Sequence, residues 1–426
     1  MTNNYREIKP IKNFKSTVNI PGSKSISNRA LILAALGKNK IILKNMLFSD
    51  DTIYMIEGLK KLGVKINLLE NKTDLEIIPP KNLQFNSTEI YIGNAGTAMR
   101  FLASYISAGK GEVILTGNSR MKERPISDLV EALKALDVDV EYVEKIGYPP
   151  IKIISNGINK DFVEIDCSKS SQYLSSLLLS ASYFKKSLTI KVKNQIVSKP
   201  YVDMTIQMIK DSGGNIKFSP LDKTYTIVPK EYNLKEYTIE GDMSSASYFL
   251  GAALIGPGEI TLKNFFKNSL QGDREFLNIL KQLGLIILEE KEKEITVKGI
   301  ETYPGIEINL NDTPDIAQTL AIVSLFSTTP SKITDVENMR IKETDRITAL
   351  NNEITKLGGN FTEFKDGFEI IPQEHYHGDF IETYDDHRMA MSFAIAGLRI
   401  PNIKILNPQC VNKTFPTFFQ ELEKLY

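Results

Sequence analysis

Two loops in the C-terminal half of the chain combine acidic with basic side chains. The segment NMRIKETDR (338–346) holds a lysine, two acids and an arginine within five residues, and the segment DTPD (312–315) ends on Asp315 just before a predicted helix. A carboxylate beside several cations normally stays ionised, which suits Asp315 as a proton acceptor or an orienting group. Glu343 is then the candidate for donating or relaying a proton. A salt-bridge network that holds domains together is the alternative interpretation of the same charges.

Basic side chains also accompany the starts of apolar helical segments. Lys24 and Arg29 lie in the first such segment, GSKSISNRALILAAL (22–36). An arginine next to an apolar helix costs desolvation unless it has an anionic partner, and a guanidinium suits carboxylate or phosphate. Helix N-termini attract anions too, through unpaired N–H groups and the helix dipole. The sequence therefore predicts a site for a small, strongly anionic ligand such as a phosphorylated metabolite. The other cations at or near helix starts are Arg100, Arg124, Lys342, Arg346, Arg388 and Lys413.

The helix starts recur at an almost constant interval. Six segments place small, hydroxyl or acidic residues before an Ala/Leu-rich run, and their anchors lie 72, 74, 74, 70 and 72 residues apart. Such a period predicts six copies of one supersecondary unit. Taken singly, each start is also explained as an ordinary N-cap, because Ser, Thr, Asp and Asn are the preferred cap residues. The anchors are Ser25, Thr97, Ser171, Ser245, Asp315 and His387.

A second series of helices alternates with the first. Segments such as MIEGLKKLGVKI end in a Leu-Gly-like stop before an alternating stretch, which predicts helix, left-handed cap and strand; Asp137 replaces the glycine in one copy. Each unit is expected to contain two helices with three or four strands. The sixth unit ends on the helix FPTFFQELEKLY (415–426), so its missing strand is expected from residues 5–20. This predicts one domain over 21–240 and another formed by 1–20 plus 241–426, with a hinge at the two crossings.

Composition narrows the class of protein. The 426 residues carry 52 basic and 52 acidic side chains, a balance that disfavours a nucleic-acid-binding surface. The two cysteines, Cys167 and Cys410, are expected to be ordinary reduced thiols, and the pair His375 and His377 has no third ligand motif, so no metal is expected. The apolar runs are too short to span a bilayer and no leader is evident, which predicts a soluble, cytoplasmic protein without membrane partners.

A series of motifs extends from residue 21 to 416 and resembles the signatures of the 5-enolpyruvylshikimate-3-phosphate synthase family, in the family's order. The motifs are PGSKSISNRALILAAL, GNAGTAMR, RMKERPI, SSQYLSS, VSKPYVDMT, GDMSSASYFL, NMRIKETDR, DDHRMAM and NKTFP. The resemblance implies an α/β fold with two inside-out barrel domains, each of three βαβαββ repeats. It also implies an active site in the interdomain cleft. There the enolpyruvyl group of phosphoenolpyruvate would pass to the 5-hydroxyl of shikimate 3-phosphate, on the route to chorismate and the aromatic amino acids.

The resemblance also implies roles for individual residues. The catalytic residues would be Asp315, Glu343 and Lys24. Shikimate 3-phosphate would be bound by Lys24, Ser25, Arg29, Ser170, Ser171, Gln172, Ser198, Tyr201, Asp315, Asn338 and Lys342. Phosphoenolpyruvate would be bound by Lys24, Asn94, Gly96, Thr97, Arg124, Gln172, Arg346, Arg388 and Lys413. No metal or organic cofactor is implied, the protein is expected to be a monomer, and Gly96 predicts inhibition by glyphosate.

Two alternatives compete with this hypothesis. The enolpyruvyl transferase that acts on UDP-N-acetylglucosamine shares the fold and the donor, but it usually carries a reactive cysteine or aspartate around RMKERPI, and residues 110–125 contain neither. A non-catalytic phosphometabolite-binding protein could keep the arginines but would not need both Asp315 and Glu343. One departure from the motifs is Phe101, where some relatives have proline.

Overall fold

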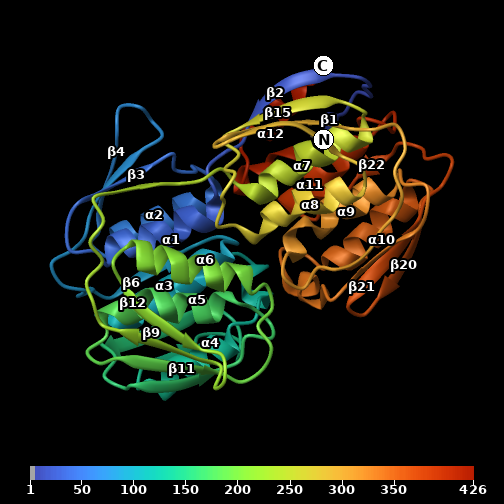
Figure 1. The fold of residues 1–426 in the computed structure, drawn as a ribbon. Coiled ribbons are helices and arrows are strands. Elements are labelled where there is room, and N and C mark those ends of the chain that lie inside the picture. The colour runs from blue at the N-terminus through green and yellow to red at the C-terminus, as the bar shows by residue number, and fades with distance from the viewer. Residues whose placement is uncertain (1–4) are drawn as a thin grey trace. The chain divides into compact units, whose positions relative to one another are not determined.

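The computed structural model describes residues 5–426, and the contacts within it divide the chain into two compact units (Figure 1). One unit is Gly22–Ile239; the other joins the described residues up to Pro21 to Glu240–Tyr426. The first four residues, which the sequence assigned to the second domain, lie outside the described part. The chain therefore passes from one unit to the other at two places, after Pro21 and after Ile239.

The unit Gly22–Ile239 contains three four-stranded sheets with one common topology. In each sheet the first two strands are parallel and the other neighbours are antiparallel. The first sheet has the order β14 (Glu236–Thr238), β3 (Ile41–Lys44), β5 (Leu75–Ile78) and β4 (Lys65–Leu68). The second has the order β6 (Thr88–Tyr91), β7 (Lys110–Thr116), β9 (Ile151–Asn156) and β8 (Asp139–Tyr142). The third has the order β10 (Phe162–Ile165), β11 (Leu188–Val192), β13 (Thr224–Val228) and β12 (Asn215–Ser219).

Three helices occupy the centre of this unit. They are α1 (Lys24–Ala35), α3 (Gly96–Ala108) and α5 (Gln172–Ser180), which pack on one another. Every residue of α3 is buried, as expected of a mainly apolar helix at the centre of a unit. The other three helices bury only one face; they are α2 (Asp50–Lys61), α4 (Ser127–Ala135) and α6 (Pro200–Asp211). The helices thus lie inside and the sheets outside (Figure 1), which is the inside-out arrangement predicted.

The second unit repeats this plan. Its first sheet has the order β2 (Lys15–Asn19), β15 (Glu259–Lys263), β17 (Glu294–Lys298) and β16 (Ile286–Lys291). The second has the order β18 (Glu307–Asn309), β19 (Ser331–Thr334), β21 (Gly367–Ile371) and β20 (Asn360–Phe364). The third has the order β22 (Phe380–Ile381), β23 (Lys404–Leu406) and β1 (Tyr5–Glu7). The buried central helices are α7 (Met243–Ile255), α9 (Ala317–Ser324) and α11 (His387–Ala396). The outer helices are α8 (Glu275–Gln282), α10 (Arg346–Lys356) and α12 (Phe418–Glu423).

The N-terminal segment supplies strands to two different sheets. As predicted, β1 completes the sheet of the sixth repeat, where Tyr5 pairs with Leu406 antiparallel to β23. The sequence did not separate β1 from β2, which lies parallel to β15 in the fourth repeat (Figure 1). From β2 the chain enters α1 in the other unit, and from β14, which pairs with β3, it enters α7. At each crossing, the strand that precedes a central helix of one unit thus pairs in a sheet of the other unit.

The predicted left-handed caps are present between the outer helices and the strands that follow them. The glycines at these positions have φ between 83° and 102°, and they are Gly63, Gly213, Gly284 and Gly358. Asp137, which replaces the glycine in the second repeat, adopts the same conformation with φ 65°. A residue with a Cβ atom is strained there, although Asp tolerates the region better than most. The turn geometry is thus fixed by the fold and not by glycine alone.

Candidate functional site

Asp315 lies in a short 3₁₀ turn (η4, Pro314–Ile316) that leads into α9, and three cations surround its carboxylate. Lys342 Nζ and Arg346 Nη1 are each 3.2 Å from Oδ1. Arg388 Nη2 is 2.9 Å from Oδ2, and Arg388 Nη1 also donates to the Asp315 carbonyl at 3.1 Å. Two of these cations come from the segment 338–346 and the third from the start of α11, so the arrangement is a tertiary one. Opposite charges at these distances favour the ionised form of a carboxylate.

Arg346 is the first residue of α10 and is almost completely buried. Its Nε donates to Asp386 Oδ2 at 2.7 Å and its Nη2 to Glu343 Oε2 at 2.8 Å. Burial by itself would lower the pKa of Arg346, but the carboxylates of Asp386, Glu343 and Asp315 together raise it above its ordinary value. Asp386 was not predicted from the sequence. Its position as the N-cap of α11, two residues before Arg388, was the available signal.

Glu343 and Lys413 extend the same network. Glu343 is buried and pairs with Arg346, while Lys413 Nζ lies 3.9 Å from its other carboxylate oxygen. Lys413 ends the 3₁₀ turn Pro408–Lys413. For Lys342, burial lowers the pKa and the nearby Asp315 opposes that shift. Six of the predicted residues thus form one network with Asp386; they are Asp315, Lys342, Glu343, Arg346, Arg388 and Lys413.

Asn338 lies close in sequence to this network, in the 3₁₀ turn Glu337–Ile341. Its Oδ1 atom is buried and accepts no hydrogen bond from the described residues. A buried acceptor without a partner costs free energy, so such atoms commonly bind a water or a ligand group. The atom is therefore suited to a substrate hydroxyl.

In the unit Gly22–Ile239, Arg29 occupies the buried face of α1. Its donors reach Thr205 Oγ1 at 2.7 Å, the Ser25 carbonyl at 2.9 Å and the Tyr201 carbonyl at 3.1 Å. Burial lowers the pKa of the guanidinium to about 10, so it stays charged at neutral pH. A buried cation held only by neutral oxygens attracts an anion strongly.

Gly96 begins α3 at a point of close approach to arginine. A Cβ atom there would lie 2.5 Å from Arg124 Nη2 and 2.8 Å from Arg100 Nη1. Arg124 is buried and donates from Nη1 to both the carbonyl and Oδ1 of Asn94 at 3.1 Å. Glycine is thus needed to let the Arg124 guanidinium lie against the start of the helix. The structure thus brings the predicted residues Asn94, Gly96 and Arg124 together.

Gln172 and Thr97 meet at the starts of α5 and α3. Gln172 Nε2 donates to Thr97 Oγ1 at 3.3 Å, and the Gln172 backbone N–H donates to Ser170 Oγ at 3.2 Å. Ser171 is buried beside them, at the N-cap of α5. This first turn therefore places two hydroxyls and a side-chain amide at a helix N-terminus, where anions are favoured.

The remaining predicted residues of this unit sit on separate elements. Lys24 Nζ forms an ion pair with Asp51 Oδ2 at 3.3 Å, a partner that the sequence did not reveal. Ser198 is buried and has φ 53°, a conformation that a non-glycine residue adopts only under constraint. Its carbonyl accepts from the Tyr201 N–H at 3.1 Å, which ties it to the start of α6.

Comparisons with known proteins agree on one family. The model of the EPSP synthase (3-phosphoshikimate 1-carboxyvinyltransferase) family matches residues 8–422. The 3-phosphoshikimate 1-carboxyvinyltransferase of Vibrio campbellii (strain ATCC BAA-1116) is 41% identical over 422 residues, which are 98% of each chain. The enzyme of the same name from Buchnera aphidicola subsp. Baizongia pistaciae is 42% identical over 98% of each chain. The chain belongs to the EPSP synthase family.

The fold agrees with solved structures of that family. EPSP synthase from Acinetobacter baumannii superposes with a TM-score of 0.81 at 24% identity, covering all of this chain and 98% of that one. A second structure of the Acinetobacter baumannii enzyme gives a TM-score of 0.79. The predicted α/β enolpyruvyl transferase fold is thus confirmed. The family assignment makes the chain an enzyme and disfavours the transferase that acts on UDP-N-acetylglucosamine.

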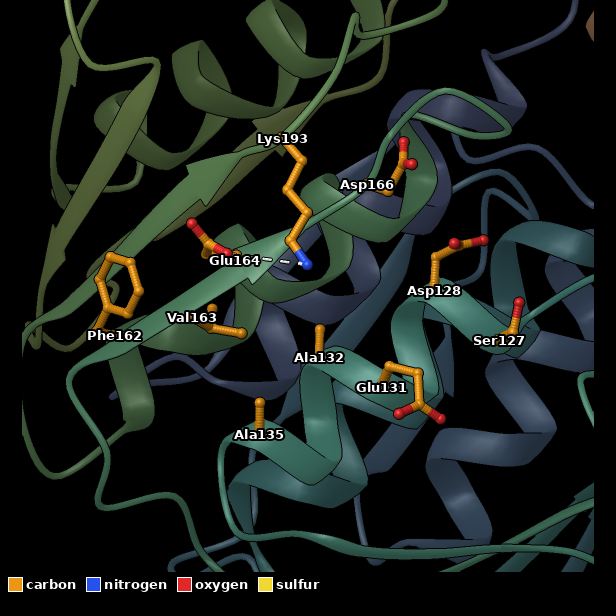
Figure 2. A pocket seen from close by; sticks show the side chains of 10 residues that line it. All are labelled: Ser127, Asp128, Glu131, Ala132, Ala135, Phe162, Val163, Glu164, Asp166 and Lys193. Atoms are coloured by element: carbon orange, nitrogen blue, oxygen red, sulfur yellow. Dashed lines mark ion pairs between the residues drawn. The ribbon is translucent and has the colours of Figure 1, made fainter.

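A cavity of about 640 Å³ lies between α4 and β10 (Figure 2). Its acidic lining includes Asp128 and Glu131 from α4 and Glu164 from β10, with Lys193 Nζ 3.8 Å from Glu164. None of the predicted site residues contributes to it. The cavity is therefore not the predicted site.

Other features of the described chain bear on function only weakly. Cys167 and Cys410 are both free and buried, and burial raises the pKa of each thiol to about 12. Between residues 5 and 426, no group of three or more His, Cys, Asp or Glu side chains is arranged to hold a metal ion. In the same range, every helix is too short or too polar to cross a membrane.

Proposed function

We propose that this chain transfers the enolpyruvyl group of phosphoenolpyruvate to the 5-hydroxyl of shikimate 3-phosphate and releases phosphate. The observation that carries the proposal is the network around Asp315 and Glu343, in which two carboxylates share four cations. A protein that only bound phosphometabolites would need the cations but not both acids. Family membership supports the same reaction.

The cations would bind the donor. Arg346, Arg388 and Lys413 are buried, and in the proposed complex they neutralise the carboxylate and the phosphate of phosphoenolpyruvate. From the other unit, Lys24 and Arg124 would bind the same substrate, with Gly96 leaving the space that the Arg124 guanidinium occupies. Fixed charges in a site without bulk water stabilise the charged transition state more strongly than solvent does.

The carboxylates would donate and accept the protons of the reaction. Glu343, or Lys24, protonates C3 of phosphoenolpyruvate, and C2 gains cationic character. Asp315 takes the proton from the 5-hydroxyl as its oxygen adds to C2. The tetrahedral intermediate then loses phosphate while a proton leaves the new methyl group, which restores the double bond. Each half of the reaction therefore needs one acid and one base.

The acceptor would be bound mainly by residues of the unit Gly22–Ile239. Arg29 and the hydroxyls of Ser170, Ser171 and Ser198 suit a phosphate, while the ring hydroxyls would meet Asp315, Asn338 and Lys342. The remaining acceptor-binding residues of the proposal are Ser25, Gln172 and Tyr201, and those for the donor are Asn94, Thr97 and Gln172. Both units would therefore supply residues to the reaction.

These groups supply the charges and protons that the proposed addition and elimination require. The proposal consequently includes no metal or organic cofactor and no nucleic-acid partner. We still predict that the protein is a monomer, that it lies in the cytoplasm and that it acts in aromatic amino acid biosynthesis.

A phosphate-release assay tests the proposal. Phosphoenolpyruvate is offered with shikimate 3-phosphate, with UDP-N-acetylglucosamine or alone. We expect phosphate release only with shikimate 3-phosphate. Release with the sugar nucleotide alone would overturn the acceptor assignment, and tight binding of both substrates without any release would indicate the non-catalytic alternative.

A further inference from the structure

Arg29 is buried without a carboxylate partner. Among the described residues its hydrogen bonds go to neutral oxygens only, including Ser175 Oγ at 3.5 Å in addition to the hydroxyl and carbonyls already described. Arg29 as a whole residue is 2% exposed. Burial is the main influence on its pKa and lowers it, and no acidic carboxyl counteracts that effect. Something other than a counter-ion must therefore hold the charge in place.

Two aromatic rings face this guanidinium. The Cζ atom of Arg29 lies 5.2 Å from the centre of the Phe101 ring and 5.9 Å from that of Tyr201. Both distances fall within the range at which a cation is attracted to an aromatic face, an attraction that grows when water is excluded. Phe101 is completely buried, so its ring is fixed by the packing of α3 against α1. Its interaction with Arg29 is therefore shielded from solvent.

The position of Phe101 on its helix links it to the other substrate site. Phe101 lies one turn after Thr97 on α3, and residues four apart lie on the same face of a helix. The start of this helix meets Arg124 and Gln172, while the next turn meets Arg29. One rigid, fully buried helix thus supports residues assigned to both substrates.

We propose that Phe101 is a positioning residue, whose ring holds the Arg29 guanidinium charged and oriented for an anionic group of the acceptor. This inference rests on the proposed function, in which Arg29 binds shikimate 3-phosphate. Without the ring, Arg29 keeps its hydrogen bonds and the more distant Tyr201 ring, but it loses the nearer aromatic contact that limits the tilt of its plane. Acceptor binding must then order the side chain, and that ordering lowers affinity.

Graded fluorination of the ring tests the proposal without changing its shape. Phenylalanine at 101 is replaced by 4-fluoro-, 3,4,5-trifluoro- and pentafluorophenylalanine, which withdraw electrons progressively from the aromatic face. We expect the Kd for shikimate 3-phosphate, measured by calorimetry, to rise with each step to about tenfold in the pentafluoro protein. The Kd for phosphoenolpyruvate and kcat should change less than about twofold. A Kd for shikimate 3-phosphate that is the same in all four proteins would overturn the proposal.

A matched pair of ordinary substitutions gives a second measurement. Phe101→Leu removes the ring beside Arg29, and Tyr105→Leu removes a ring of equal burial one turn later on α3, where it packs on Phe85. We expect both to lose stability, and only Phe101→Leu to raise the KM for shikimate 3-phosphate. Equal effects of the two variants on that KM would show that Phe101 acts only through packing.

A double-mutant cycle identifies Arg29 as the partner. In an Arg29→Met background, Phe101→Leu should leave the Kd for shikimate 3-phosphate unchanged, because the group it positions is absent. Additive effects would contradict the proposal. Failure of the proposed function can be distinguished from failure of this inference. In the first case the unsubstituted protein itself would release no phosphate or bind no shikimate 3-phosphate.

Discussion

Asp386 Oδ2 accepts a hydrogen bond from Arg346 Nε across 2.7 Å, and both side chains are almost fully buried. The same carboxylate accepts from the backbone N–H of Arg388 at 2.8 Å. One acid therefore orients the guanidinium of Arg346 and caps the helix that begins beside Arg388. Neither Asp386 nor its pairing was predicted from the sequence.

Asp386→Asn should weaken use of phosphoenolpyruvate. The amide retains an oxygen for capping α11, but it removes a charge from the surroundings of Arg346. Partial loss of a buried ion pair leaves the cation poorly compensated and free to turn. We expect kcat/KM for phosphoenolpyruvate to fall by roughly tenfold or more in steady-state assays. Asp345→Asn is the control, because Asp345 caps the neighbouring helix α10 through Thr348 N–H. Equal activity of the two variants would argue against the orienting role.

Asp315→Ala should strongly reduce turnover while sparing donor binding. Removal of the proposed base is expected to lower kcat by about 10²-fold or more. The substitution also frees Lys342, Arg346 and Arg388 from a competing carboxylate, so the Kd for phosphoenolpyruvate should stay equal or become tighter. Single-turnover kinetics and calorimetry measure the two quantities. An unchanged kcat would remove the role assigned to Asp315, and a much weaker donor Kd would show that it mainly positions the cations.

Gly96→Ala should displace Arg124. The new Cβ atom would lie 2.5 Å from Arg124 Nη2, which is closer than real contacts allow. We expect the unsubstituted enzyme to be inhibited by glyphosate and the variant to show higher values of both the phosphoenolpyruvate KM and the glyphosate Ki. Gly251→Ala in α7 is a suitable control, since its nearest contact would be a side-chain methyl at 3.2 Å. Full activity of the unsubstituted enzyme in millimolar glyphosate would contradict the prediction.

Asp273 should make the stability of its unit depend on pH. Burial, followed by the charge of Asp315, raises its pKa to about 6; Arg388 and a hydrogen bond from Ser244 oppose the rise, and Asp242 adds to it. Because the folded pKa exceeds the unfolded value near 4, the contribution to stability is complete below about pH 4 and is lost as pH rises through about 6.

Asp273→Asn should remove that dependence. Relative to the unsubstituted protein, the variant is expected to gain about 2 to 3 kcal/mol in unfolding free energy between pH 4 and pH 8, following the linkage between pKa and stability. Urea denaturation at a series of pH values measures the difference. Asp312→Asn, at an exposed position near the same site, serves as the control. A difference that stays constant with pH would show that Asp273 does not titrate in this window.

Asp137→Gly should stabilise the unit Gly22–Ile239. At φ 65° a glycine avoids the strain of a Cβ atom, and this gain competes with the greater freedom of glycine in the unfolded chain. We expect a net gain of at most about 1 kcal/mol, seen as a rise in Tm. Gly63→Asp at the equivalent cap of the first repeat should have the opposite effect. Destabilisation by Asp137→Gly would indicate that the aspartate forms a stabilising contact, for instance with Lys160, its ion-pair partner at 3.3 Å.

Local features of the sequence determined the repeat and the types of residue at the site. The capping residues and the left-handed turns depend on a few neighbouring residues, and the near-constant spacing of the six anchors can be counted along the chain. All three were therefore visible without the fold. The cations near helix starts were visible for the same reason. The motif resemblance supplied the roles of Asp315 and Glu343, which stay predictions.

Tertiary structure decided how distant segments combine. The sequence offered one N-terminal strand for the sixth repeat, whereas β1 joins that sheet and β2 joins the sheet of the fourth repeat. The sheet that a strand joins depends on how the whole unit packs. Asp386 meets Arg346 across 40 residues, and Phe101 meets Arg29 across two helices. Such contacts arise from the packing of whole elements, and no local pattern of residues encodes them.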